Sequence, residues 1–323
     1  MRAIAPYLGS RSKDLLIAAP DDDAAVWRGD PLVVATTDTM VEEIDFRLGW
    51  PGFDFRTLGR RLISINLSDF AGMGAEPRYA LVSLCLRGSI SLHDVRRLYR
   101  GISEQAARFG VAIAGGDLSG TLGSLTLGAT LVGRLSSPRT VLRRDGARSG
   151  WMIAVTGSLG GAGAGLRLLE RGQSPSSAPE RTWVAAQLDP QPRLSAGRAL
   201  VAAGVTVGGD ISDGLAREVE RLVEFRRPRA SSRAAALGAT IEIDSIPLAR
   251  GIDRADWRVA SDSEDFELIC AGPARRIDVA GQALRRLKLP LTVIGRIEAQ
   301  PGIRWRHGGR LESLDGAGYE HFR

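Results

Sequence analysis

Acidic side chains that stand beside glycines or at the ends of apolar runs are the chemically conspicuous residues of this 323-residue chain. The chain has no Cys-x-x-Cys pair and no histidine cluster to accompany them. Oxygen ligands without nitrogen or sulfur select hard cations such as Mg²⁺, which commonly hold a nucleoside triphosphate during phosphoryl transfer. The pattern therefore predicts a metal-dependent phosphoryl transferase. The acids are Asp21, Asp22, Asp23, Asp38, Asp69, Asp117, Asp210, Asp213, Glu264 and Asp265.

Asp69 lies in the run Ile65–Pro77, which follows an apolar pattern with helical spacing. Gly72 and Gly74 predict the end of that helix. Burying an unpaired carboxylate is costly, so a bound metal ion would explain this position. Considered alone, Asp69 is explained equally well as a cap at a helix end beside a tight turn. The metal interpretation depends on the other acids.

A glycine-rich stretch, Gly157–Gly165, is predicted to open a helix that runs to about Arg171. It is similar to a phosphate loop but lacks the Gly-Lys-Ser/Thr ending of a P-loop. Close packing of a helix explains the small residues at least as well as phosphate binding does.

Composition is typical of a folded globular protein, with 44% hydrophobic and 25% charged residues. The net charge is +6 and the basic residues are nearly all arginine, with Lys13 and Lys288 the exceptions. These arginines are scattered and form no block interleaved with aromatic residues. We therefore expect phosphate-bearing metabolites rather than nucleic acid as partners.

The two cysteines, Cys85 and Cys270, lie far apart in apolar runs and are expected to be buried free thiols. No apolar run approaches membrane-spanning length, and the first 20 residues make a poor signal peptide. These features predict a cytoplasmic protein without a membrane partner.

Alternating strands and helices are predicted along the chain, which indicates an α/β or α+β sandwich. Ser91 is expected to cap a helix that ends near Phe109. The turn-rich segment Arg143–Gly150 is the candidate boundary between domains 1–142 and 143–323. Strands are expected at Leu32–Thr39, Tyr79–Leu86, Val111–Asp117, Ser124–Gly133, Trp151–Thr156, Ala239–Ile246 and Leu291–Arg296, and helices at Pro192–Ala203 and Leu215–Phe225.

Short motifs in one order along nearly the whole chain resemble the thiamine-monophosphate kinase family. They read D-D-A-A-V, T-T-D-T-M-V, N-L-S-D-F-A-G-M-G-A-E-P, G-G-D, R-R-D-G-A, D-I-S-D-G-L and E-D-F-E-L. None is specific alone, but the ordered set is. That family belongs to the superfamily of aminoimidazole-ribotide synthetase and the hydrogenase maturation protein that dehydrates a carbamoyl group.

The resemblance implies a two-domain α/β architecture like that of aminoimidazole-ribotide synthetase. It implies a homodimer built on the N-terminal sheets, and an N-terminal domain that binds ATP and Mg²⁺. The implied reaction is direct, Mg²⁺-assisted transfer of the γ-phosphoryl group of ATP to thiamine monophosphate, which gives thiamine diphosphate.

Site residues follow from the same resemblance, motif by motif. The implied Mg²⁺ ligands are Asp23, Thr36, Thr37, Asp38, Asp69, Asp117, Asp210 and Asp213. The implied ATP contacts are Gly116, Asp117, Arg144 and Ser212, with Arg144 and Asp213 in catalytic roles. The implied substrate side holds Asp45, Glu264 and Gly316.

Departures from the family pattern concentrate on the acceptor side. The changed positions are Asp21 for Gly, Asp45 for His, Asp262 and Ser263 for Gly-Gly, Phe266 for Tyr, and Gly316 for Trp. Two alternatives therefore stand beside a thiamine-monophosphate kinase. One is a relative that uses ATP on a different acceptor, and the other is a nucleotide-binding regulator with weakened turnover.

Overall fold

The computed structural model describes residues 15–17, 26–30, 32–137, 140–224 and 237–314. Its chain divides into two compact units. The first comprises 1–70, 75–138 and 188–190, and the second comprises 71–74, 139–187 and 191–323. Within the described residues, no helix is long and apolar enough to cross a membrane.

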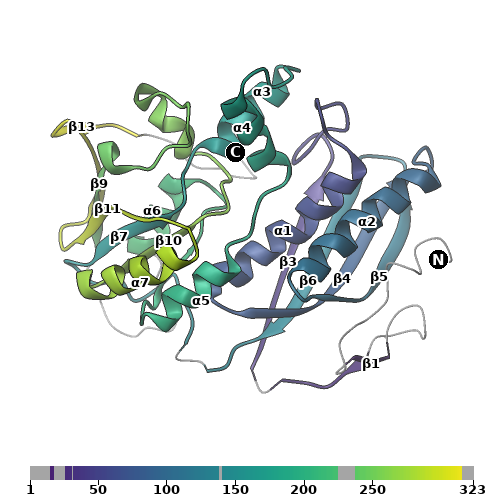
Figure 1. Cartoon of the computed structure of the whole chain (residues 1–323), viewed down its shortest axis with the longest axis horizontal. Helices are drawn as coiled ribbons and strands as arrows, with labels where there is room; N and C mark the ends of the chain where they lie inside the picture. Colours follow the sequence, from purple (N-terminus) through teal and green to yellow (C-terminus); the bar gives the residue numbers. More distant parts are fainter. Residues whose placement is uncertain (1–14, 18–25, 31, 138–139, 225–236, 315–323) are drawn as a thin grey trace. The chain divides into compact units, whose positions relative to one another are not determined.

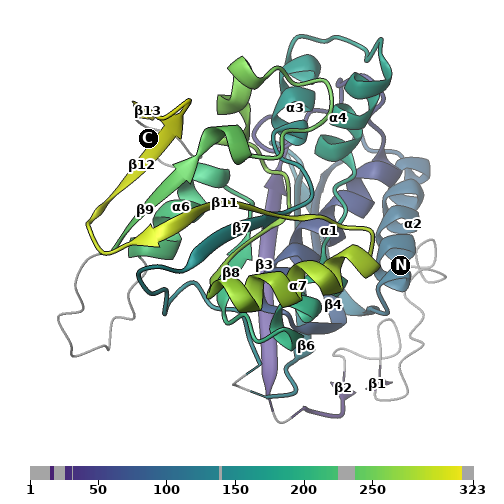
Figure 2. The same ribbon diagram turned by 60° about the vertical axis from the view of Figure 1, so that its left-hand side comes forward.

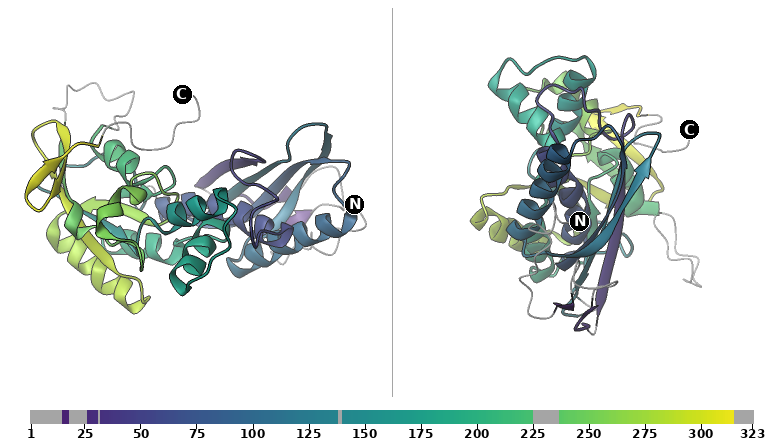
Figure 3. Two further views of the ribbon diagram at one scale, coloured as in Figure 1. Left: turned by 90° about the horizontal axis from the view of Figure 1, so that it is seen from above. Right: turned by 90° about the vertical axis from the view of Figure 1, so that its right-hand side faces the viewer.

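A four-stranded sheet organises the first unit, in the order β3-β6-β4-β5. Strands β4 and β5 run parallel and the other neighbours are antiparallel. Helices α1 and α2 lie on the same side of this sheet (Figures 1 and 3). The bounds are β3 Val33–Val41, α1 Phe55–Met73, β4 Glu76–Arg87, α2 Leu92–Arg108, β5 Ala112–Thr121 and β6 Thr126–Arg134. A separate antiparallel pair is formed by β1 Leu15–Ile17 and β2 Val26–Trp27.

Local sequence explains most of these elements. Ser91 caps α2, as predicted, because its side chain accepts a hydrogen bond from the Asp94 N–H. On β3, half-buried and exposed residues alternate along most of the strand, which shows that one face packs under α1 and the other stays open. Buried leucines and isoleucines such as Leu62 and Ile63 fill the space beneath α1, each stabilising the fold by roughly 1.5–3 kcal/mol.

One predicted boundary in this unit is confirmed and another is wrong. Helix α1 ends at Met73, between Gly72 and Gly74 as predicted, and the φ of +68° at Gly74 suits glycine. The strand predicted to stop at Asp117 continues to Thr121, because β4 offers a partner as far as Arg87. Asp117 therefore lies in the middle of an edge strand.

A seven-stranded sheet organises the second unit, in the order β13-β12-β9-β11-β7-β10-β8. Only β12 and β9 run parallel among its described strands. The strand bounds are β7 Met152–Thr156, β8 Val207–Asp210, β9 Gly238–Glu242, β10 Leu268–Gly272, β11 Leu291–Glu298, β12 Gly302–His307 and β13 Arg310–Glu312. The helix bounds are α3 Gly161–Glu170, α4 Ala178–Leu188, α5 Leu194–Ala202, α6 Leu215–Glu224 and α7 Ala274–Arg286, with 3₁₀ turns at Ile243–Ser245 and Arg254–Ala260.

The main core of this unit lies between the sheet and α6. Val219 and Leu222 of α6 pack with strand residues, and Trp257 stacks on Trp305 with ring centroids 5.5 Å apart. Helices α6 and α7 lie on opposite sides of the sheet (Figure 2). The mixed α/β class predicted from the sequence is confirmed.

Candidate active site

Strand β3 presents its predicted ligands on two faces. The side chain of Thr36 points toward α1, where its hydroxyl donates a hydrogen bond to the carboxylate of Asp69. The main-chain N–H of Asp38 donates to Oδ1 of Asn66, also on α1, at 3.0 Å. Asn66 and Asp69 stand three residues apart and so share one side of the helix. Asp69 lies inside α1 and binds a neighbouring strand, so it does not act as a helix-end cap.

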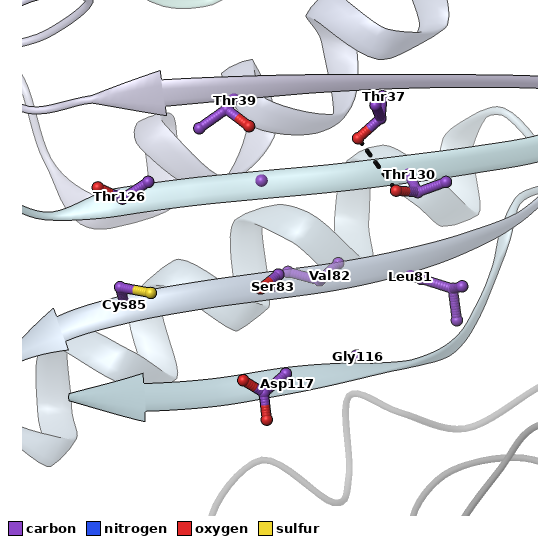
Figure 4. Close-up of a pocket in the computed structure, with 11 residues that line it drawn as sticks. Thr37, Thr39, Leu81, Val82, Ser83, Cys85, Gly116, Asp117, Thr126 and Thr130 are labelled. Atoms are coloured by element: carbon purple, nitrogen blue, oxygen red, sulfur yellow. Dashed lines mark hydrogen bonds between the residues drawn. The ribbon is translucent and has the colours of Figure 1, made fainter.

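The open face of the same sheet carries the next candidates. Thr37 and Asp117 line a pocket of about 300 Å³ there, together with Ser83 and Thr130 (Figure 4). The hydroxyl of Thr130 donates to that of Thr37 at 3.0 Å. Successive strand residues point to opposite faces, so the side chains of Thr36 and Thr37 cannot share one metal ion. Asp117 faces the same way as its register partner Ser83, away from α1.

Gly116, the residue before Asp117, is required by close packing of the backbone. A Cβ atom at this position would stand 1.8 Å from the carbonyl oxygen of Val82, and the φ of Gly116 is +150°. Its main chain therefore lies directly against β4 at the edge of the pocket.

Asp45, Gly316 and Asp23 are the next predicted site residues, and the structure describes only the first of them. The carboxylate of Asp45 accepts a hydrogen bond from the Val41 N–H at 2.6 Å, and so stabilises the turn after β3. Asp23 and Gly316 lie outside the described residues.

In the second unit, two acidic segments lie side by side. Main-chain hydrogen bonds join Ile211 to Glu267 at 2.8 Å and to Phe266 at 2.9 Å. They bring the segment from Asp210 to Asp213, which includes the half-buried Ser212, next to the segment that contains Glu264. A Cβ atom at Gly214 would stand 2.0 Å from the carbonyl oxygen of Ser261, so this junction requires glycine.

Asp210 ends β8 and is only 2% exposed. Arg144 lies beside it, with Nη2 3.7 Å from Oδ1 of Asp210. Arg221 of α6 holds the carboxylate of Asp213 in an ion pair. The structure therefore brings together four of the residues predicted for this unit: Asp210, Ser212, Asp213 and Arg144.

Glu218 joins this group and was missed by the sequence reasoning. It is 1% exposed, pairs with Arg221, and has Oε2 3.6 Å from Nε of Arg144. Burial raises the pKa of Glu218 to about 7 although Arg144 and Arg221 lower it, and Asp210 adds to the rise. The signal in the sequence was an acid on the apolar side of the helix predicted at Leu215–Phe225.

Main-chain N–H groups of the glycine-rich segment Gly157–Gly165 donate hydrogen bonds to an acidic side chain of the same protein. Asp265 accepts hydrogen bonds from the N–H groups of Gly160 at 2.6 Å and Ala162 at 3.1 Å, and Ser263 accepts one from Gly163. Burial raises the pKa of Asp265 to about 6. The helix end is thus capped from within the chain.

Packing accounts for the glycines in this segment. A Cβ atom at Gly165 would stand 2.2 Å from the carbonyl oxygen of Trp183 on α4. Because the donors are used and the backbones touch, the packing alternative holds for Gly157–Gly165, and the phosphate-loop alternative does not.

The donor chemistry of the two acidic groups suits Mg²⁺. Thr36 and Asp69 in the first unit, and Asp210 and Asp213 in the second, supply oxygen alone. Among the residues that the structure describes, no three acidic, His or Cys side chains form a metal-binding group by themselves. These two pairs of residues therefore offer the kind of donor atom that Mg²⁺ binds.

Known proteins are similar to this chain over nearly its whole length. Residues 21–135 match the family model described as AIR synthase related protein, N-terminal domain. The chain is 34% identical over 316 residues to the thiamine-monophosphate kinase of Synechococcus elongatus, a match that covers 93% of this chain and 90% of that one.

Solved structures agree over similar lengths. The crystal structure of thiamine-monophosphate kinase from Stenotrophomonas maltophilia is 27% identical, with a TM-score of 0.79 and 96% of both chains covered. The structure of AaThiL complexed with AMPPCP and TMP is 26% identical, with a TM-score of 0.74, and the match covers 90% of this chain and 87% of that one. The expected aminoimidazole-ribotide-synthetase-like fold is thereby confirmed.

Proposed function

Because the chain belongs to the thiamine-monophosphate kinase family, we propose that it transfers the γ-phosphoryl group of ATP to thiamine monophosphate and releases thiamine diphosphate and ADP. The observation that carries this proposal is the similarity to kinases of that name over at least nine-tenths of both chains. Binding of AMPPCP and TMP by the similar AaThiL supports ATP as the co-substrate and a kinase reaction.

The chain's own residues suit direct transfer between two phosphates. An oxygen of the acceptor phosphate attacks the γ-phosphorus as the bond to ADP breaks, so no enzyme nucleophile is needed. Arg144, as a catalytic residue, would hold phosphate oxygens with its guanidinium group. Gly116 and Ser212 would contact ATP, and Gly116 is exposed at the edge of the pocket.

Mg²⁺ is the metal that the donor set suits. When bound, it would neutralise the charge on the phosphoryl oxygens during transfer. Asp213 is placed among the catalytic residues by its position in the D-I-S-D-G-L motif, and it pairs with Arg221. The proposed ligands are Asp23, Thr36, Thr37, Asp38, Asp69, Asp117, Asp210 and Asp213.

The acceptor side is proposed to include Asp45, Glu264 and Gly316. A carboxylate such as that of Glu264 attracts a cationic ring like the thiazolium of thiamine. Asp45 and Gly316 stand where the family has His and Trp, so we expect weak binding of thiamine monophosphate with ATP binding retained.

Assembly and compartment complete the proposal. The open face of β3 carries the exposed residues Val33, Ala35, Thr37 and Thr39 in a row, a surface suited to the sheet of a second copy. We assign the chain to a homodimer through this face. The free cysteines Cys85 and Cys270 support a reducing cytoplasm.

A phosphoryl-transfer assay tests the proposal. Purified protein is incubated with ATP, Mg²⁺ and a panel of phosphorylated acceptors, and products are identified by phosphorus NMR. Formation of thiamine diphosphate with equal formation of ADP is expected. Turnover of another acceptor, with none of thiamine monophosphate, would contradict the proposed substrate, and binding of ATP without turnover of any acceptor would contradict the kinase activity.

A further inference from the structure

Glu218 is the charged side chain among the buried residues of α6, which are otherwise leucine, alanine and valine. The Glu218 side chain is only 1% exposed. Burying an unpaired charge costs on the order of several kcal/mol, so this carboxylate needs positive charge beside it. Its compensation comes from two arginines. Oε1 pairs with Arg221, and Oε2 lies 3.6 Å from Nε of Arg144.

Each of these arginines also reaches a proposed Mg²⁺ ligand. Nη2 of Arg221 pairs with Oδ2 of Asp213, and Nη2 of Arg144 lies 3.7 Å from Oδ1 of Asp210. Glu218 therefore lies at the centre of an ion-pair network in which two guanidinium groups are shared among three carboxylates.

Gly209 on β8 lies against this arrangement at ordinary van der Waals distance. A Cβ atom there would stand 3.4 Å from Nε of Arg144 and 3.7 Å from Oε2 of Glu218. Nε of Arg144 is buried and has no hydrogen-bond acceptor among the described residues, and the carboxylate of Glu218 lies 3.6 Å from it.

We propose that Glu218 is a positioning residue for phosphoryl transfer, which holds Arg144 and Arg221 and limits their pairing with Asp210 and Asp213. The inference rests on the proposed function. The physical reason is competition: a guanidinium that pairs fully with a ligand carboxylate reduces that carboxylate's affinity for a cation. By taking a share of both guanidinium groups, Glu218 leaves Asp210 and Asp213 able to bind Mg²⁺.

Glu218→Gln tests this inference, since it keeps the size of the side chain and removes its charge. Glu220→Gln is the matched control, because Glu220 is two residues away and pairs with Arg217 instead. Calorimetry with AMPPCP and Mg²⁺ measures binding without turnover. We expect Glu218→Gln to weaken binding by about 10- to 100-fold, the range for residues that support metal ligands, and to raise the Mg²⁺ requirement. The control should bind as the wild type does.

A double variant separates positioning from a merely structural role. Removal of Arg221 frees Asp213 from its guanidinium partner, so Glu218→Gln combined with Arg221→Gln should bind Mg²⁺ and AMPPCP more tightly than Glu218→Gln alone. A structural role predicts further weakening instead, and that result would overturn the inference. Unchanged binding by Glu218→Gln would do the same.

Folding and the proposed function are checked separately. Thermal unfolding of each variant shows whether it is folded; if Glu218→Gln is not, Glu218→Asp keeps the charge, shortens the reach and should give an intermediate loss. Wild-type protein that binds AMPPCP but does not phosphorylate thiamine monophosphate contradicts the assigned acceptor and leaves the test of Glu218 intact. Wild-type protein that does not bind AMPPCP overturns both.

Discussion

The hydroxyl of Thr36 on β3 donates a hydrogen bond to the carboxylate of Asp69, 33 positions later on α1. This contact joins the T-T-D motif to the N-L-S-D motif and gives a half-buried acid a neighbouring oxygen. Thr37, the next residue, faces the opposite side of the sheet and bonds to Thr130. Adjacent residues of one motif therefore serve different surfaces of the first unit.

Replacement of the proposed ligands should abolish metal-dependent binding of nucleotide. Asp69→Asn and Asp213→Asn each remove a negative charge from an oxygen-only group, so the affinity for AMPPCP in the presence of Mg²⁺ should fall by about 10-fold or more. Calorimetry with and without Mg²⁺ measures this. Asp278→Asn, at an exposed position on α7, is the control. Equal affinity in all three variants would refute the assignment.

The open face of the four-stranded sheet should form the homodimer. Ala35→Arg places a charge in the middle of the exposed row on β3, so it should convert the dimer to a monomer through desolvation and repulsion between copies. Light scattering at micromolar concentration measures the mass. Val279→Arg, on the exposed side of α7, should remain dimeric. A monomeric wild type would count against this interface.

The acceptor site should respond to Asp45. Asp45→His restores the residue type of the family, so the KM for thiamine monophosphate should fall while the KM for ATP stays constant. The same change removes the acceptor of the Val41 N–H, so unfolding should become easier by about 1 kcal/mol. Steady-state kinetics and urea unfolding measure the two effects. Gly316→Trp should lower the KM as well, and unchanged KM values in both variants would show that neither position contacts the acceptor.

Asp265 should stabilise the second unit through the start of α3. Asp265→Asn replaces one acceptor oxygen by a donor facing the Gly160 and Ala162 N–H groups, so it should cost about 1–2 kcal/mol of stability. Urea unfolding with Asp278→Asn as the control tests this value. A loss no larger than that of the control would show that the cap is dispensable.

The same variant has an expected pH dependence. Because burial raises the pKa of Asp265 to about 6, the folded chain keeps this proton where the unfolded chain has lost it. Stability from this group is therefore complete below the ordinary aspartate pKa and is lost as the pH rises through about 6. The free energy of unfolding of the wild type should exceed that of Asp265→Asn by more near about pH 4 than near about pH 7. An advantage that grows with pH would contradict the raised pKa.

Local patterns in the sequence determined several elements of both units. Alternation along β3, the Ser91 cap of α2 and the apolar spacing of α6 are short-range features, because each depends on residues within a few positions. The same patterns identified the acids and the family to which the motifs belong, although Asp38 and Asp117 lie within their strands and not at the ends. Helix α7 was not predicted, although Ile277, Ala280 and Leu284 recur there at helical spacing.

Only the tertiary structure decided which of these residues meet. The register of β5 on β4 places Asp117 on the open face with Thr37, although the motifs suggested one set of ligands with Asp69. Asp265 caps α3 from 105 positions away, and Glu218 gains its partner Arg144 from outside its own helix. Such contacts follow from sheet register and from helix packing against a core, which depend on the whole chain and not on the few residues around each position.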